Sequence, residues 1–107
     1  MPEELRHEIE REAGEPCVRV SGDLDMNGTL RLEGVLDDLL DEAPERILID
    51  LSGASFVDST GMNLLFSFER DARSRGIAVE LVPGPPEVMR VFETTGLASV
   101  LPFRAGT

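Results

Sequence analysis

The stretch Phe56–Gly61, which reads FVDSTG, places an acid, two hydroxyls and a glycine directly after a mostly aliphatic part of the chain. An acid at the end of a strand can cap the next helix, because its side chain accepts hydrogen bonds from the free N–H groups there. The same geometry presents Ser59 at the surface, where another enzyme can modify it. The stretch therefore supports two interpretations, a helix cap and a chemically addressed serine.

The chain lacks the residue patterns that common classes of enzyme need for catalysis. Aspartic proteases use Asp-Thr/Ser-Gly, whereas one more residue separates Asp58 from Gly61 here. A serine hydrolase needs Gly-x-Ser-x-Gly and a histidine, but His7 is the only histidine and lies in a charged segment. There is no lysine for a phosphate-binding loop and no Cys/His cluster for zinc. We therefore expect no catalytic residue, no metal site and no cofactor.

A phosphate on Ser59 would change what this surface binds without unfolding its helix. The N–H groups and the dipole at a helix N-terminus tolerate an anion, and a phosphoserine carries about −1.5 to −2 charges at pH 7. Asp58 is adjacent, and we expect Asp25 to converge from an earlier loop. At about 6 Å and an effective dielectric constant near 20, one carboxylate opposes such a phosphate by roughly 5 kcal/mol. A partner fitted to the neutral hydroxyl would lose affinity.

The charge balance narrows the class of partner. Asp and Glu number 21 against 10 basic residues, all of them Arg, which gives a formal charge of −11 over 107 residues. Such a chain repels nucleic acid and anionic lipid and suits a protein partner with a basic surface. No apolar stretch approaches the roughly 20 residues of a membrane helix, and the N-terminus lacks a signal-peptide pattern. We expect one cytoplasmic domain over residues 1–107, with no direct membrane insertion, and a buried thiol at Cys17.

Hydrophobic periodicity predicts an α/β fold. The pattern of residues 3–13 is compatible with a helix or a strand; together with the β-prone run at 17–20 we favour a hairpin. The remaining elements follow in order: a turn at Gly22–Asp25, a helix capped by Asp25 or Asn27 and ended by Pro44, a strand at 47–51, a loop at 52–55, a helix at 59–75, a strand at 77–82 and a helix from 85 to 96. Strands separated by helices call for parallel pairing. We expect a small mixed, mainly parallel sheet with an N-terminal hairpin and helices packed against it.

Four motifs in this order resemble the STAS domain, and specifically the stand-alone anti-sigma factor antagonists. They are GDLD at 22–25, ILIDLS at 47–52, FVDSTG at 56–61 and TGL at 95–97. The resemblance covers about residues 5–103 and implies the STAS fold and a partner switch. The unphosphorylated antagonist binds an anti-sigma factor that is also a serine kinase, and a sigma factor is released. Phosphorylation then frees the antagonist, and a serine phosphatase resets it.

The resemblance also assigns residues. Ser59 matches the phosphoacceptor, and Thr60 is the secondary candidate as the next hydroxyl. The expected partner-binding residues are Asp23, Asp25, Asp58 and Asn63, of which Asp58 also shapes the acceptor loop. Gly22 and Gly61 are expected to matter for backbone geometry. Met62-Asn63 follows Gly61 where the family often has Leu-Gly, and the first helix opens with Met26-Asn27-Gly28 where a smoother start is common; these departures bear on the choice of partner.

Two other functions compete with this one. A STAS subunit can serve as a fixed scaffold, in a stress-signalling assembly or on a membrane lipid-transport ATPase, without being phosphorylated. An enzyme or a small-molecule binder is disfavoured by the missing His, Cys and Lys chemistry. A kinase assay and co-purification separate the switch from the scaffold, and a ligand-dependent melting temperature would favour a small-molecule binder.

Overall fold

One four-stranded sheet organises the part of the chain that the computed structural model describes, residues 3–104. The strands are β1 (Arg6–Glu12), β2 (Glu15–Leu24), β3 (Arg46–Val57) and β4 (Ala78–Val82), and the helices are α1 (Met26–Asp41), α2 (Ser59–Ser74), α3 (Pro86–Thr95) and α4 (Leu97–Val100). The strand order is β1-β2-β3-β4. β1 pairs antiparallel with β2, while β2, β3 and β4 are parallel. The mixed, mainly parallel sheet with an N-terminal hairpin is confirmed.

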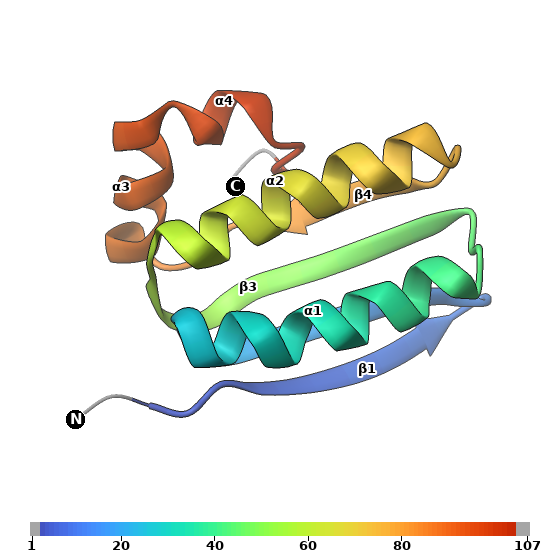
Figure 1. Cartoon of the computed structure of the whole chain (residues 1–107), viewed down its shortest axis with the longest axis horizontal. Helices are drawn as coiled ribbons and strands as arrows, with labels where there is room; N and C mark the ends of the chain where they lie inside the picture. The colour runs from blue at the N-terminus through green and yellow to red at the C-terminus, as the bar shows by residue number, and fades with distance from the viewer. Residues whose placement is uncertain (1–2, 105–107) are drawn as a thin grey trace.

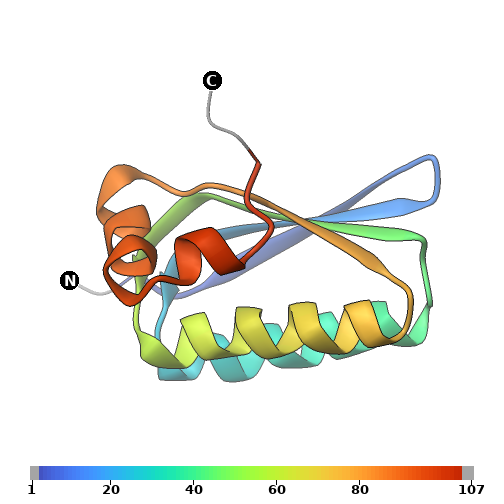
Figure 2. The ribbon, with the colours of Figure 1, turned by 90° about the horizontal axis from the view of Figure 1, so that it is seen from above.

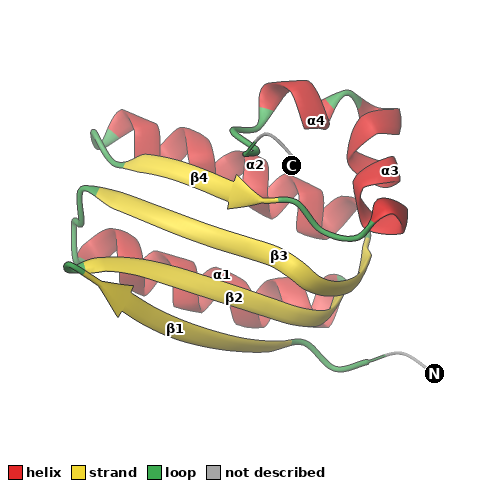
Figure 3. Ribbon diagram, turned by 180° about the vertical axis from the view of Figure 1, so that it is seen from behind, coloured by secondary structure: helices red, strands yellow, loops and turns green. Residues whose placement is uncertain are grey.

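The two long helices form a layer on one face of the sheet. α1 and α2 lie side by side there, and α3 and α4 pack beside the end of the sheet near β4 (Figures 1 and 2). From the opposite side, the other face of β1, β2 and β3 carries no helix (Figure 3). The core lies between the two layers and is mainly aliphatic; its fully buried side chains include Leu32, Leu36, Leu39, Ile47, Ile49, Leu51 and Leu65.

Two segments that the sequence assigns to a turn and a loop belong to strands instead. Gly22, Asp23 and Leu24 continue β2, and residues 52–55 continue β3. The pairing between these strands shifts register between Arg19 and Ser21 and again between Gly22 and Asp23. Such irregularities let a strand accommodate a residue with positive φ, as Gly22 has at 84°, without ending the ladder. Both parallel strands therefore reach further toward the helix starts than the sequence predicts.

Helix ends follow local signals. α1 ends before Pro44, with Ala43 in the left-handed region at φ 51°, and Gly76 at φ 79° follows the C-cap of α2. Gly96 at φ 82° closes α3, and the short helix α4 that follows it has no counterpart among the predicted elements. No helix within residues 3–104 is long and apolar enough to cross a membrane.

The prediction of a buried thiol at Cys17 is wrong. Cys17 is half-buried, since it alternates along β2 with the fully buried Val18 and so faces the side of the sheet without helices. Burial, together with the nearby Asp50 carboxylate, still raises the pKa of the Cys17 thiol above its ordinary value. A higher pKa lowers the fraction of the thiol that is present as the nucleophilic thiolate at neutral pH.

Candidate functional site at the helix N-termini

Two neighbouring strands each deliver an aspartate to the start of a helix. Leu24 and Val57 pair at the carboxyl ends of β2 and β3, and Asp25 and Asp58 follow them directly. Each aspartate is the N-cap of the next helix and has the extended backbone that a cap needs. The Asp25 carboxylate accepts a hydrogen bond from the N–H of Gly28 at 2.9 Å. Of the two predicted caps for α1, Asp25 rather than Asn27 takes that place.

Asp58 holds the first turn of α2 with one oxygen. Its Oδ1 accepts hydrogen bonds from the N–H of Thr60 at 2.9 Å and of Gly61 at 3.2 Å. The Thr60 hydroxyl donates to the same oxygen. Ser59 is the first residue of the helix, its side chain is exposed, and its hydroxyl takes no part in this cap. Two adjacent hydroxyls therefore differ in state: that of Thr60 is half-buried and engaged, and that of Ser59 faces solvent.

The first turns of α1 and α2 lie against each other. Thr29 Oγ1 is 3.5 Å from Thr60 Oγ1, so the hydroxyl that braces the Asp58 cap also borders α1. Gly61 faces the end of β2, and a Cβ on it would stand 2.6 Å from Leu24 Cγ and 2.7 Å from the Leu24 carbonyl oxygen. No larger residue fits there without moving Leu24, which is fully buried. This close approach seats the first turn of α2, and with it Ser59, against the end of β2.

Asp23 lies beneath the N-terminal segment rather than on the surface. It is 8% exposed, and its carboxylate accepts a hydrogen bond from the N–H of Glu3 at 2.9 Å. Its own N–H donates to the Glu3 carbonyl at 2.9 Å, and the Ser55 hydroxyl donates to the Glu3 carboxylate at 2.9 Å. Beside it, a Cβ on Gly22 would stand 2.4 Å from the Glu4 carbonyl oxygen. Asp23 and Gly22 thus tie the N-terminal segment across the ends of β2 and β3.

Asn63 is exposed on α2, four residues after Ser59 and therefore on the same side of the helix. The structure thus brings together Asp25, Asp58 and Ser59, with Asn63 beside them, and sets Asp23 below them. Thr29 was missed by sequence reasoning, since its contact with Thr60 joins residues 31 apart and no local pattern marks it. Glu3 was missed for the same reason.

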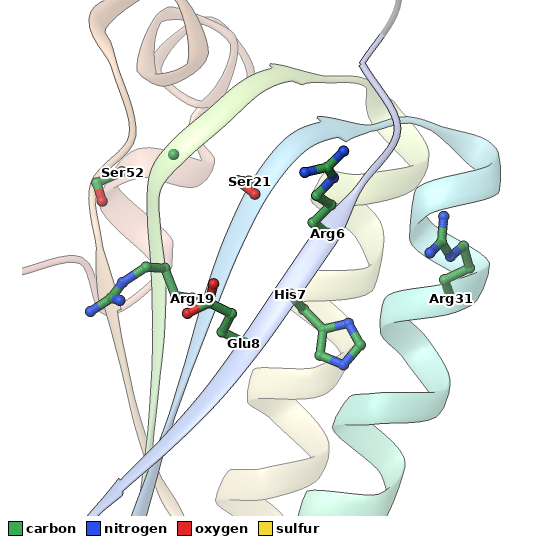
Figure 4. A pocket seen from close by; sticks show the side chains of 8 residues that line it. Arg6, His7, Glu8, Arg19, Ser21, Arg31 and Ser52 are labelled. Carbon is green, nitrogen blue, oxygen red and sulfur yellow. The ribbon is translucent and has the colours of Figure 1, made fainter.

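A separate cavity of about 590 Å³ lies beside β1 and is not part of this site. Arg6, Arg19 and Arg31 line it, but Arg19 contacts Glu10 at 2.8 Å and Arg31 contacts Glu4 at 2.7 Å. The lining residues also lie on both sides of the β1 ribbon, so they do not converge on one point (Figure 4). Within residues 3–104 there is no cluster of three or more His, Cys, Asp or Glu side chains that could hold a metal ion.

The site can therefore present a modifiable hydroxyl between two capped helices, and nothing in its geometry resembles a nucleophile with its base. The anti-sigma-B factor antagonist of Staphylococcus aureus (strain NCTC 8325 / PS 47) is 28% identical over 90 residues, which are 84% of this chain and 83% of that protein.

Solved structures show the same fold. An anti-sigma factor antagonist from Mycobacterium paratuberculosis superposes with a TM-score of 0.88 at 25% identity, covering 99% of this chain and 90% of that one. The anti-sigma factor antagonist SpoIIAA in its unphosphorylated form gives a TM-score of 0.77 at 20% identity, covering 94% and 89%. The family model for the STAS domain matches residues 6–106. The chain belongs to the STAS domain family.

Proposed function

We propose that this chain is an anti-sigma factor antagonist switched by phosphorylation of Ser59. The unphosphorylated form binds an anti-sigma factor that is also a serine kinase, and the sigma factor held by that kinase is released. Transfer of a phosphoryl group from ATP to Ser59 ends the complex, and a serine phosphatase restores the binding form. The antagonist itself performs no catalysis. Its similarity to relatives that carry the name anti-sigma-B factor antagonist supports the first part of this proposal.

The single observation that carries the choice of residue is the different state of two neighbouring hydroxyls. Ser59 is exposed at the start of α2 and outside the cap. Thr60 donates to Asp58 and borders Thr29, so a phosphate on Thr60 would remove a hydrogen bond and place its charge against the cap carboxylate. A kinase can reach Ser59 without disturbing either helix.

Charge explains how the phosphate would act. The Asp58 carboxylate already occupies the N–H groups of Thr60 and Gly61, so a phosphate on Ser59 stays outside the cap and projects toward solvent. It adds about −1.5 to −2 charges beside Asp58 and near Asp25. A partner that has packed against a neutral hydroxyl would have to solvate this charge, and its affinity would fall by orders of magnitude.

Intact-mass spectrometry tests the assignment directly. The protein is incubated with ATP and with each purified candidate serine kinase from its own cell, beside Ser59→Ala and Thr60→Val. We expect one added phosphate on the wild type and on Thr60→Val, and none on Ser59→Ala. Phosphate on Ser59→Ala would make the acceptor assignment wrong. A kinase that binds the wild-type chain but never phosphorylates it would instead support a fixed scaffold in a signalling complex.

A further inference from the structure

The outer face of α1 carries two apolar side chains that no part of the fold covers. Met26 is 64% exposed and Leu30 is 66% exposed, more than any other large apolar side chain within residues 3–104. They are four residues apart and so lie on one side of the helix. The side chains that α1 turns toward the sheet belong to another set: Leu32, Leu36, Leu39 and Leu40. Met26 and Leu30 therefore contribute nothing to the core.

These two residues share a surface with Ser59. Thr29 precedes Leu30, Thr60 follows Ser59, and the two threonine hydroxyls are 3.5 Å apart, so the first turns of both helices are adjacent. α1 and α2 run side by side on the same face of the sheet, with their outer faces turned the same way (Figures 1 and 2). We call Met26, Leu30, Ser59 and Asn63 the two-helix surface.

Two acidic side chains next to the two-helix surface indicate that its binding partner is basic. Glu33 and Asp37 continue the side of α1 that bears Leu30, at spacings of three and four residues. Both are exposed, and neither forms an ion pair with the residues that the structure describes, 3–104. A second copy of this chain would bring the same acids and a charge of −11 against them, and an anionic lipid surface would repel them as well.

We propose that the two-helix surface docks a protein that offers an apolar pocket for Met26 and Leu30 and Lys or Arg side chains for Glu33 and Asp37. This inference rests on the proposed function, because the protein in question is the kinase that modifies Ser59. The apolar anchors supply affinity, and the acids speed the encounter and set its orientation. Ser59 lies inside the contact area, so its phosphate acts within the interface that the anchors hold.

Binding of the purified kinase, measured by isothermal titration calorimetry with ADP present, tests this surface. Met26→Ala/Leu30→Ala should bind at least about tenfold more weakly than the wild type. Val100→Ala is the matched control, since Val100 is 60% exposed on α4, and it should bind within about twofold of the wild type. In a separate stopped-flow measurement of association, Glu33→Gln/Asp37→Asn should lower the association rate and reduce its dependence on salt.

The outcomes separate this inference from the proposed function. If Met26→Ala/Leu30→Ala binds as tightly as the wild type and is still phosphorylated on Ser59, the docking surface is wrong and the switch stands. If the kinase neither binds nor phosphorylates the wild type, both fall. Sedimentation of the chain alone, and with phosphatidylglycerol vesicles, covers the other occupants: self-association or lipid binding that the double variant abolishes would overturn the inference. An unchanged melting temperature of the double variant shows that the fold is intact.

Discussion

Two glycines in helices should respond oppositely to the same substitution. A Cβ on Gly61 would stand 2.6 Å from Leu24 Cγ and 2.7 Å from the Leu24 carbonyl oxygen, about 1 Å inside ordinary contact. Gly34 lies in the middle of α1, is exposed and has no atom within 4 Å of the same position. Gly61→Ala therefore forces α2 away from β2, whereas Gly34→Ala only removes the conformational freedom of a glycine.

The magnitudes follow from these contacts. Overpacking typically costs 1–3 kcal/mol, and about 3 kcal/mol applies at Gly61, because one of the two obstructing atoms belongs to the backbone. Replacing a glycine inside a helix by alanine stabilises the helix by up to about 1 kcal/mol, and this offsets part of the overpacking cost. Gly61→Ala should thus destabilise the protein by about 2 kcal/mol, and Gly34→Ala should stabilise it by about 1 kcal/mol. Taking about 4 °C for each kcal/mol, the melting temperatures should move by about −8 °C and +4 °C.

Urea unfolding followed by far-UV circular dichroism is the assay, since the chain has no Trp or Tyr to report by fluorescence. The two variants and the wild type should share one m-value, so that midpoints translate into free energies of unfolding. A Gly61→Ala protein as stable as the wild type, or stabilised like Gly34→Ala, would refute the argument that α2 is seated directly on Leu24. The position of Ser59 would then need another explanation.

Three further predictions concern side chains near the strands and helix starts. Asp58→Ala removes the acceptor of two backbone N–H groups and should lower the free energy of unfolding in urea by about 2 kcal/mol. Asp25→Ala removes the acceptor of one such group and should lower it by about 1 kcal/mol. Equal losses would contradict the cap geometry. Burial works against ionisation of Asp50, but hydrogen bonds from Ser52 and the contact with Arg19 outweigh it and lower the pKa of Asp50. Ionised Asp50 therefore stabilises the fold at neutral pH, and the stability difference between the wild type and Asp50→Asn should shrink as the pH falls below about 4; a constant difference would exclude this linkage. Iodoacetamide should alkylate the only cysteine more slowly than it alkylates glutathione at pH 8, and urea should remove the difference.

The sequence predicts those elements whose signal lies in a short, continuous stretch of residues. The apolar stripe of α1 and the aliphatic run of β3 identify their buried faces without any knowledge of neighbours, because each pattern repeats with the period of its own structure. Asp58 followed by Thr60 and Gly61 predicts a capped helix for the same reason. The same pattern places Ser59 at the first position of the helix, outside the hydrogen bonds of the cap.

What the sequence could not predict depends on contacts between distant segments. Gly22 with a positive φ is a turn signal by itself, yet pairing with β3 keeps it inside a strand. Gly22, Asp23 and Leu24 are all buried in succession, which breaks the alternation expected of a strand, because the N-terminal segment covers one side of this stretch. The burial of Asp23 requires Glu3, twenty residues away, and no local pattern contains that information. The exposure of Met26 and Leu30, by contrast, is visible in the sequence, because both residues fall outside the apolar stripe that contains Leu32 and Leu36.

Three connections lie at the end of the sheet away from Ser59, and all three are short turns. The β1–β2 turn contains Gly14, the link from α1 to β3 spans 42–45, and the link from α2 to β4 contains Gly76 (Figure 1). A Cβ added at Gly14 or Gly76 would meet no atom within 4 Å apart from its chain neighbours, and the ion pair between Arg11 and Glu42 at this end of the sheet is exposed and contributes little to stability. A fluorophore, a short tag or a fused domain can therefore be attached at these turns while the helix starts stay free. The molecule can be anchored at one end and remain available for recognition at the other.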